Sequence, residues 1–364
     1  MDDLEYAFLR RQWLPIGRSE DLTAEKPLAA RLLDKDLVLY RVAGVATAAG
    51  AYCPHRGMNL SMGTMVRGGL ECPYHGWRFG ADGKCVAIPS LPEGAGPGVS
   101  RLRLVRCTER YGHIWAVLDP PDVGPPEIPE LDDGSGWQIL CGVPHDLPCG
   151  IRQLTENFRD IAHFPFVHGP TMGPNVTRVV PSYSVNQRGR DLIWSVPMDL
   201  GGTAFDSNQG VAGRQDMTYH LTLPCFSRIR TEFPDGGRRY TVQLVAPLDR
   251  YGQAARQFWL VAIDRIVNER HHVNIEEMFD YERRIFEEDW PILANQDPAE
   301  PPLDLRQQAH TRADAFSIKY RRSYQDLLLK LQVELETTRF ADANQEQELA
   351  QPSGSATVGV TFED

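Results

Sequence analysis

Cys53-Pro-His55 and Cys72-Pro-Tyr-His75-Gly-Trp77 are the two stretches that decide what this chain binds and how its first part folds. Each stretch offers one thiol and one imidazole, and sixteen residues lie between His55 and Cys72. Two sulfur ligands and two imidazoles can hold a single tetrahedral zinc ion or a cluster of two irons. Zinc signatures normally use other spacings, so we favour the two-iron cluster over zinc.

The combination of ligand types fits a Rieske [2Fe–2S] centre, in which two thiolates bind one iron and two histidines bind the other. The spacing of these residues, with the Gly-Trp that follows His75, resembles the Rieske ligand motif. The resemblance implies that Cys53 and Cys72 hold one iron and that His55 and His75 hold the other. Neutral histidine ligands raise the reduction potential, so such a centre accepts electrons readily.

The composition is that of a globular protein of 364 residues, enough for two or three domains. A formal net charge of −11 argues against a general affinity for nucleic acid or for anionic membranes. We expect no signal peptide, because the N-terminus lacks a basic region followed by an apolar run. No apolar stretch is long enough to span a bilayer. Seven cysteines, two of them assigned to iron, fit a reducing compartment, so we expect a cytoplasmic protein.

Short β-type segments separated by turn residues run from about residue 28 to residue 118. They predict a small antiparallel β domain that carries the cluster ligands in its loops. The proline-rich stretch 119–129 is not expected to form regular structure, because proline fixes φ and lacks an N–H donor. We therefore predict a Rieske domain over residues 1–120 and a linker over residues 121–130.

Residues 131–337 are expected to form a second domain, in which a second candidate metal site lies. Alternating segments between about residues 178 and 264 indicate an antiparallel sheet of several strands, and helical periodicity covers residues 274–293 and 313–335. The polar residues 338–364 are expected to be a disordered tail. The predicted fold class is α+β, with an all-β N-terminal domain followed by an antiparallel sheet flanked by helices.

A second candidate metal site lies in the segment Asn157-Phe-Arg-Asp160-Ile-Ala-His163-Phe-Pro-Phe-Val-His168. Asp160 and His163 are three residues apart and would share one face of a helix. His163 and His168 would point apart on an unbroken helix. Pro165 should end or kink that helix, so that His168 can turn back toward the same metal. Two histidines and one carboxylate form the facial triad of non-haem iron(II) oxygenases.

The third ligand must be a carboxylate from elsewhere in the chain. Asp289 lies on a largely apolar helical stripe beside Pro291, where an ionised carboxylate is costly unless something neutralises it. The acidic run 287–289 can equally be a solvated helix face. Asp297, in a Gln-Asp-Pro turn, is the alternative carboxylate.

Both segments resemble those of the α subunits of Rieske non-haem iron oxygenases. Residues 157–168 are similar to the Asn-x-x-Asp-x-x-His-x-x-x-x-His motif of that family, and residues 286–296 are similar to the segment that supplies its aspartate ligand. The resemblance implies that iron(II) is held by His163, His168 and Asp289. It also implies a homotrimer in which Asp160 bridges the two metal centres. Asp160 would accept hydrogen bonds from His163 and, across the subunit interface, from His75 of a neighbouring subunit.

The resemblance is strongest to the caffeine-type N-demethylases and to the dicamba- and vanillate-type O-demethylases. It implies a terminal oxygenase component that hydroxylates or oxidatively demethylates a small aromatic or heterocyclic substrate with O₂, as in aromatic catabolism. The alternatives are a dioxygenase that cis-dihydroxylates an aromatic ring and, from another class, a Rieske electron carrier without catalysis. No segment has the features of a dinucleotide site, so electrons from NAD(P)H must arrive through a separate ferredoxin or flavin reductase.

Overall fold

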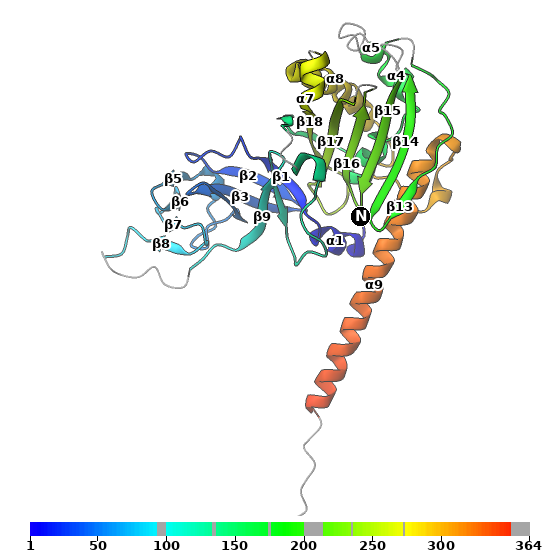
Figure 1. Ribbon diagram of the computed structural model, residues 1–364. Coiled ribbons are helices and arrows are strands. Elements are labelled where there is room, and N and C mark those ends of the chain that lie inside the picture. The colour runs from blue at the N-terminus through cyan, green and yellow to red at the C-terminus, as the bar shows by residue number, and fades with distance from the viewer. Residues whose placement is uncertain are drawn as a thin grey trace, which may run out of the picture.

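The protein has a small all-β part at one side of a larger part that is built on an antiparallel sheet (Figure 1). The computed structural model describes residues 1–92, 100–132, 136–173, 176–199, 214–233, 236–271 and 274–350. Within these ranges no helix is both long enough and apolar enough to cross a membrane.

Two sheets build the small part. The larger one has the strand order β1-β10-β9-β4-β3-β2 and the smaller one the order β5-β6-β7-β8. Tyr40, in the middle of β3, is fully buried between them and donates a hydrogen bond to the carbonyl of Gly80 at 2.9 Å. The predicted antiparallel β domain is confirmed. Its strands are β1 (Leu14–Arg18), β2 (Leu28–Leu32), β3 (Lys35–Val42), β4 (Val45–Gly50), β5 (Thr64–Val66), β6 (Gly69–Glu71), β7 (Arg78–Phe79), β8 (Cys85–Ala87), β9 (Leu104–Arg110) and β10 (His113–Val117).

The sheet of the larger part has eight strands, in the order β11-β18-β17-β16-β15-β14-β13, with β12 also paired to β18. From β13 to β18 each strand pairs antiparallel with its neighbour in the sequence, as the alternating segments predicted. His220 on β15 lies directly opposite Arg228 on β16, so their side chains lie on the same face of the sheet. The strands are β11 (Gln138–Cys141), β12 (His145–Leu147), β13 (Asn186–Arg188), β14 (Asp191–Asp199), β15 (Arg214–Thr222), β16 (Phe226–Glu232), β17 (Arg238–Pro247) and β18 (Ala255–Ile263).

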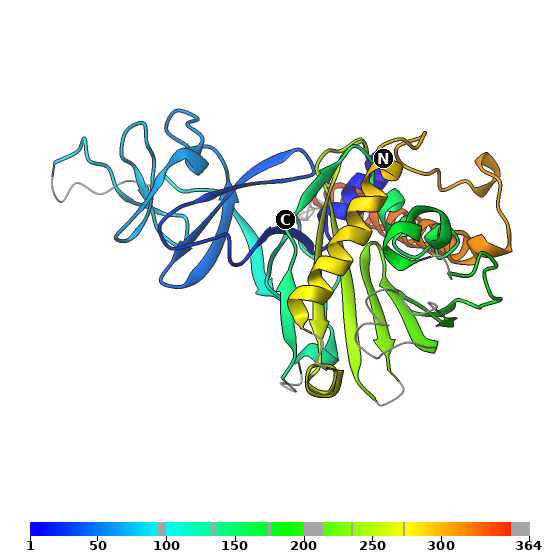
Figure 2. The same ribbon diagram turned by 90° about the horizontal axis from the view of Figure 1, so that it is seen from above.

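Helix α8 (Ile275–Leu293) lies across one face of this sheet (Figure 2). Its Met278 and Phe286 pack in one buried cluster with Trp259 and Val261 of β18. The expected α+β class is therefore confirmed. The other helical elements are α1 (Asp3–Arg10), α2 (Pro129–Asp132), α3 (Ile151–Asn157), α4 (Phe164–Val167), α5 (Gly169–Met172), α7 (Arg265–His271) and the 3₁₀ turns η1 (Leu60–Met62), η2 (Leu305–Gln307) and η3 (Arg312–Asp314).

The C-terminal helix α9 (Ala315–Ala350) begins two residues after the start of the helix that we predicted over residues 313–335, and it extends beyond the predicted end. The expectation of a disordered tail from residue 338 is wrong as far as residue 350. That stretch is polar but rich in Ala, Glu and Gln, which have high helix propensity, so polarity alone did not indicate disorder. Residues 351–364 of the expected tail lie outside the described residues.

The linker also departs from the prediction at its end, where α2 begins at Pro129. Proline suits the first turn of a helix, since the N–H that it lacks would have no partner there. Helix α1 then ties the N-terminus to the larger part. Glu5 pairs with the buried Arg152 of α3, and Phe8 contacts Tyr324 of α9 edge to face, with the ring centres 5.7 Å apart.

Candidate metal centres

Three of the predicted iron ligands come together beside α8. His163 Nε2 and His168 Nε2 each lie 3.4 Å from Asp289 Oδ1, and the two nitrogens are 3.0 Å apart. His168 and Asp289 are buried, and His163 is half-buried. Two imidazoles and one carboxylate facing a common point are the donor set of a facial triad. Asp297, the alternative carboxylate, is exposed and does not belong to this cluster.

The local backbone brings the histidines together in a way that differs from the prediction. Helix α3 already ends at Asn157, so Asp160 and His163 do not share a helix face. The two histidines flank the one-turn helix α4 instead, as its N-cap and C-cap residues. Pro165 lies in the first turn of α4 and starts a helix rather than ending one.

Carboxylates orient both imidazole rings from behind. His163 Nδ1 lies 3.1 Å from Asp160 Oδ2, and His168 Nδ1 lies 2.9 Å from Glu288 Oε2. A hydrogen bond at Nδ1 leaves Nε2 free to bind a metal. Glu288 also accepts a hydrogen bond from Thr171 Oγ1 at 2.7 Å, which fixes its carboxylate. Glu288 was not among the predicted site residues, because nothing in its local sequence pattern separates it from the neighbouring acids.

The charges of the triad call for a cation. Burial alone would raise the pKa of Asp289, but hydrogen bonds from His163 and His168 lower it to about 2. Burial alone would lower the pKa of His163, but Asp160 and Asp289 raise it to about 9. The carboxylates of Asp160 and Asp289 thus favour a positive charge between the imidazole rings. A divalent metal supplies this charge while the imidazoles stay neutral. The residues therefore fit a mononuclear iron(II).

A small, mostly apolar cavity of about 50 Å³ adjoins the triad between α8 and the sheet, and Arg239 and Glu282 also line it. Side chains from β15, β16 and β17 form one wall, and side chains of α4, α5 and α8 form the other. They include Phe164, Met172, Met217, Ile229, Thr231 and Phe286.

The four predicted cluster ligands lie in two loops of the small part that share one backbone pattern. The carbonyls of Cys53 and Cys72 accept from the N–H of Gly57 and Gly76, at 2.9 and 3.0 Å. Both glycines have a φ of 67°, a left-handed conformation that other residues adopt at a cost. The same backbone turn therefore presents each cysteine and its histidine.

Burial separates the two kinds of ligand. Cys53 and Cys72 are 3% and 2% exposed, whereas His55 and His75 are exposed. The two imidazole rings meet edge to face at 4.6 Å between centroids, and the His55 ring stacks on Trp77.

The ligand types and their spacing favour the two-iron cluster over zinc. Burial, and after it the neighbouring thiol of Cys72, raises the pKa of Cys53 to about 11, so Cys53 would ionise near neutral pH only on binding a metal. Within the described ranges, the ligand atoms of His163, His168 and Asp289 lie within 4.8 Å of one another, and no other group of three or more potential ligands is as close. The four side chains of the small part do not converge as they would on a single zinc ion, which leaves a two-iron cluster as the better fit.

Two family comparisons cover both parts of the chain. Residues 12–107 match the Rieske [2Fe-2S] domain, and residues 147–330 match the vanillate O-demethylase oxygenase C-terminal domain. The chain belongs to the Rieske non-haem iron oxygenases. As a member of this family it is an O₂-dependent oxidoreductase, and the prediction of a demethylase-type α subunit is confirmed. The alternative of an electron carrier without catalysis is excluded by the second domain.

Individual relatives agree with this assignment. Methylxanthine N1-demethylase NdmA of Pseudomonas putida is 27% identical over 338 residues, which cover 90% of each chain. The oxygenase component of dicamba O-demethylase from Stenotrophomonas maltophilia is 36% identical over 165 residues, 44% of this chain and 48% of that one. The structure of Pseudomonas putida CBB5 NdmA with caffeine is similar with a TM-score of 0.76 at 25% identity, over 90% of this chain and 93% of that chain.

Membership of the family also settles the classes of cofactor and partner. The cofactors of this Rieske oxygenase are a [2Fe–2S] cluster and a mononuclear iron, with reducing equivalents from NAD(P)H delivered indirectly. Its partners are a substrate, O₂ and a reductase or ferredoxin.

Proposed function

We propose that this Rieske oxygenase removes an N- or O-linked methyl group from a small aromatic or heterocyclic substrate. The observation that carries the proposal is the triad of His163, His168 and Asp289 at the wall of an apolar cavity. The similarity to N- and O-demethylases supports demethylation over cis-dihydroxylation of a ring.

Iron(II) in the triad would supply activation of O₂ at its open coordination positions. The protein contributes position and exclusion of water. Asp160 and Glu288 hold the two imidazoles in place, and Asn157 Nδ2 donates to Asp289 Oδ1 at 3.1 Å. Met172 and Phe286 offer apolar surface that suits a flat ring.

The reaction balances as an oxidative demethylation. One oxygen atom of O₂ enters a C–H bond of the methyl group, and the other leaves as water with two protons and two electrons from the reductase. The hydroxymethyl product is a hemiaminal or a hemiacetal, which breaks down to formaldehyde and the demethylated amine or alcohol.

We also propose that the oxygenase is a homotrimer in which electrons pass between subunits. Within one chain the cluster loops lie in the small part, whereas the triad lies beside α4 and α8 in the larger part (Figure 1). The exposed His75 would face Asp160 of a neighbouring subunit, whose side chain is 37% exposed and already contacts His163. Asp160 would then link the two centres by hydrogen bonds. The seven unpaired cysteines support the cytoplasm as the compartment in which we propose that it acts.

The test is a screen for formaldehyde release over N-methyl, O-methyl and aromatic acid substrates, with a surrogate reductase and ¹⁸O₂. We expect formaldehyde equal to the demethylated product, with one atom of each O₂ consumed going to water. A cis-dihydrodiol that carries two labelled oxygens and forms without formaldehyde would replace demethylation by dihydroxylation.

A further inference from the structure

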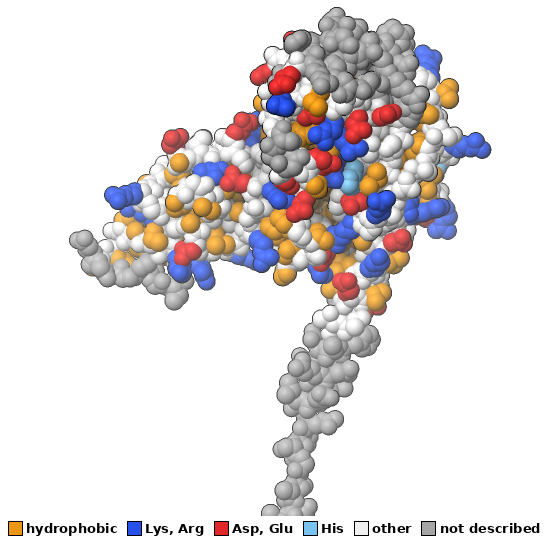
Figure 3. Space-filling view, viewed as in Figure 1, with side chains coloured by type: hydrophobic (Ala, Val, Ile, Leu, Met, Phe, Trp, Pro, Cys, Tyr) orange, Lys and Arg blue, Asp and Glu red, His pale blue; other side chains and the backbone are white. Residues whose placement is uncertain are grey.

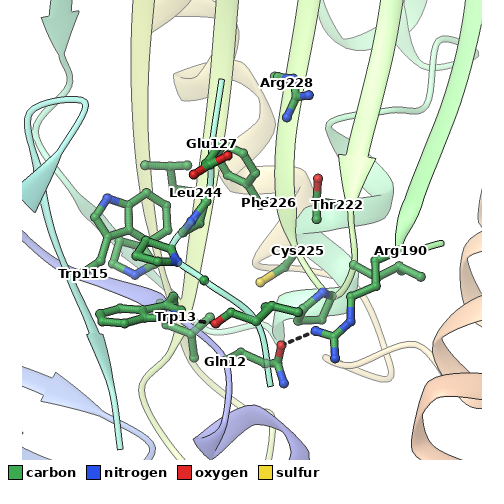
Figure 4. Close-up of a pocket in the computed structure, with 18 of the residues that line it drawn as sticks. Gln12, Trp13, Trp115, Glu127, Arg190, Thr222, Cys225, Phe226, Arg228 and Leu244 are labelled. Atoms are coloured by element: carbon green, nitrogen blue, oxygen red, sulfur yellow. Dashed lines mark hydrogen bonds between the residues drawn. The ribbon is translucent and has the colours of Figure 1, made fainter. Parts of the chain in front are cut away.

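A second cavity lies on the face of the eight-stranded sheet opposite the triad. Its volume is about 650 Å³, which is ample for a small molecule. Because side chains alternate along a strand, Met217 and Ile229 line the cavity at the triad, whereas His220 and Arg228 line this one. The linker and the small part of the chain close the cavity from the other side (Figure 4).

Arg228 is the residue that points to a ligand. Its side chain is only 9% exposed, and its Nη1 has no hydrogen-bond partner. Its Nη2 lies 3.5 Å from His220 Nε2. That nitrogen is also 2.9 Å from Asp191 Oδ1, so it carries the hydrogen that is donated to Asp191 and has no lone pair for Arg228. Neither Nη1 nor Nη2 of Arg228, which lines the cavity, therefore has an acceptor (Figure 4).

The other charged side chains at the cavity already have partners. On this face of the molecule, acidic and basic side chains gather around a histidine over the larger sheet (Figure 3). Asp191 accepts from Thr222 Oγ1 at 2.6 Å, Glu127 lies 3.4 Å from Arg110, and Arg190 lies 3.6 Å from Asp122 and donates to Gln12 Oε1 at 2.7 Å. Burial lowers the pKa of Arg228, although Tyr240, Glu130 and Asp191 act in the opposite direction. The cavity is thus suited to an anion.

The rest of the wall is aromatic and aliphatic. Trp115 and Phe226 meet edge to face at 5.9 Å between ring centroids, and Leu244, Pro125 and Pro126 extend this surface. Such a wall favours a flat apolar group over a compact hydrated ion.

We propose that this cavity is a second binding site, separate from the metal site, for a small aromatic carboxylate. Its carboxylate would pair with Arg228 through two parallel N–H···O bonds, and its ring would lie against Trp115, Phe226 and Leu244. A bound carboxylate would give the buried Nη1 of Arg228 the hydrogen-bond acceptor that it lacks. Arg228 precedes Ile229 on β16, so the occupant touches the strand that also walls the cavity at the triad.

The experiment is a calorimetric titration of the iron-loaded enzyme with benzoate, with benzamide as the neutral isostere. We expect one benzoate per chain, no measurable binding of benzamide, and an affinity that falls about tenfold or more in Arg228→Gln. Arg230→Gln is the matched control, because Arg230 lies on the same strand face but pairs with Glu232 at 3.1 Å and does not line the cavity. Ile229→Trp, which fills the cavity at the triad, should leave this benzoate site intact.

Several results would overturn the proposal. Equal affinities in Arg228→Gln and the parent enzyme would do so, as would equal binding of benzamide. Loss of binding in Ile229→Trp alone would place the benzoate at the triad. Inorganic phosphate that binds as tightly as benzoate would leave an anion site without aromatic specificity. If the parent enzyme binds no benzoate and Arg228→Gln changes the oligomeric state, Arg228 belongs to a contact between subunits instead.

Thermal unfolding gives a readout that does not depend on the calorimetry. Without ligand, Arg228→Gln should unfold at the same temperature as the parent enzyme or higher, since it removes a buried cation whose Nη1 has no hydrogen-bond acceptor. Benzoate should raise the unfolding temperature of the parent enzyme but not of the variant. An unfolding temperature of Arg228→Gln well below that of the parent, with and without benzoate, would show that Arg228 has a structural partner instead.

Discussion

Replacing Glu288 by alanine should weaken iron binding at the triad without disturbing the Rieske cluster. Glu288 Oε2 is the partner of His168 Nδ1 at 2.9 Å, and Thr171 holds the other carboxylate oxygen. His168 is 1% exposed, so bulk water cannot easily take over the lost hydrogen bond. The ring would lose both its orientation and part of its basicity as a ligand.

The expected loss is about 10- to 100-fold in iron(II) affinity, the usual effect of removing such a partner. This corresponds to roughly 1.4 to 2.8 kcal/mol. Glu288→Gln keeps an oxygen that can accept from Nδ1–H, so it should lose less than Glu288→Ala.

The assay is competition for iron(II) with a graded series of chelators, followed by iron analysis. The visible absorption of the Rieske cluster serves as an internal check of folding. Glu287→Ala is the matched control, because Glu287 is the adjacent acid but its side chain is 40% exposed and pairs with Arg283 at 2.7 Å. Equal iron affinity in Glu288→Ala and Glu287→Ala would refute the role of Glu288.

Three further predictions concern other parts of the molecule. Asp160→Asn should keep both metal centres occupied but nearly abolish turnover, and normal activity coupled to the reductase would refute the bridging role. Ile229→Trp should block substrate turnover while iron content stays unchanged, since it fills the cavity at the triad. Burial, reinforced by the nearby Glu5, raises the pKa of Glu300 from 4.5 to about 7 despite Arg152. Protonated Glu300 therefore contributes fully to the free energy of unfolding below pH 4.5. This contribution, about 3 kcal/mol, is lost as the pH rises from 4.5 through 7. Glu300→Gln should match the parent enzyme in thermal unfolding at pH 5 and exceed it at pH 8; the same difference at both values would contradict this.

Residues that carry chemistry at fixed spacing could be predicted from the sequence. Cys53 and His75 belong to two loops with the same backbone turn, so the ligand types and their spacing describe the site almost completely. Asp289 lies far along the chain from His163, and its assignment depended on the resemblance to a family. The alternation of the strands was also sufficient to predict the large sheet.

Contacts between distant segments could not be predicted in this way. Glu288 reaches His168 across 120 positions of sequence, and no local pattern distinguishes it from Glu287. The end of α3 and the start of α4 depend on how the segment packs around the triad. Pro165 was therefore predicted to end a helix, whereas it lies in the first turn of one. The cavity at Arg228 is assembled from the linker, the first domain and β16, and only the folded chain brings them together.

The most direct test of the account is the iron content of the enzyme compared with that of Asp289→Ala. We predict about three irons per chain in the parent enzyme and about two in the variant. The variant should keep a Rieske spectrum that the reductase can still bleach, and it should release no formaldehyde. A variant that retains the third iron, or that still demethylates substrate, would contradict the assignment of this triad as the place where O₂ reacts.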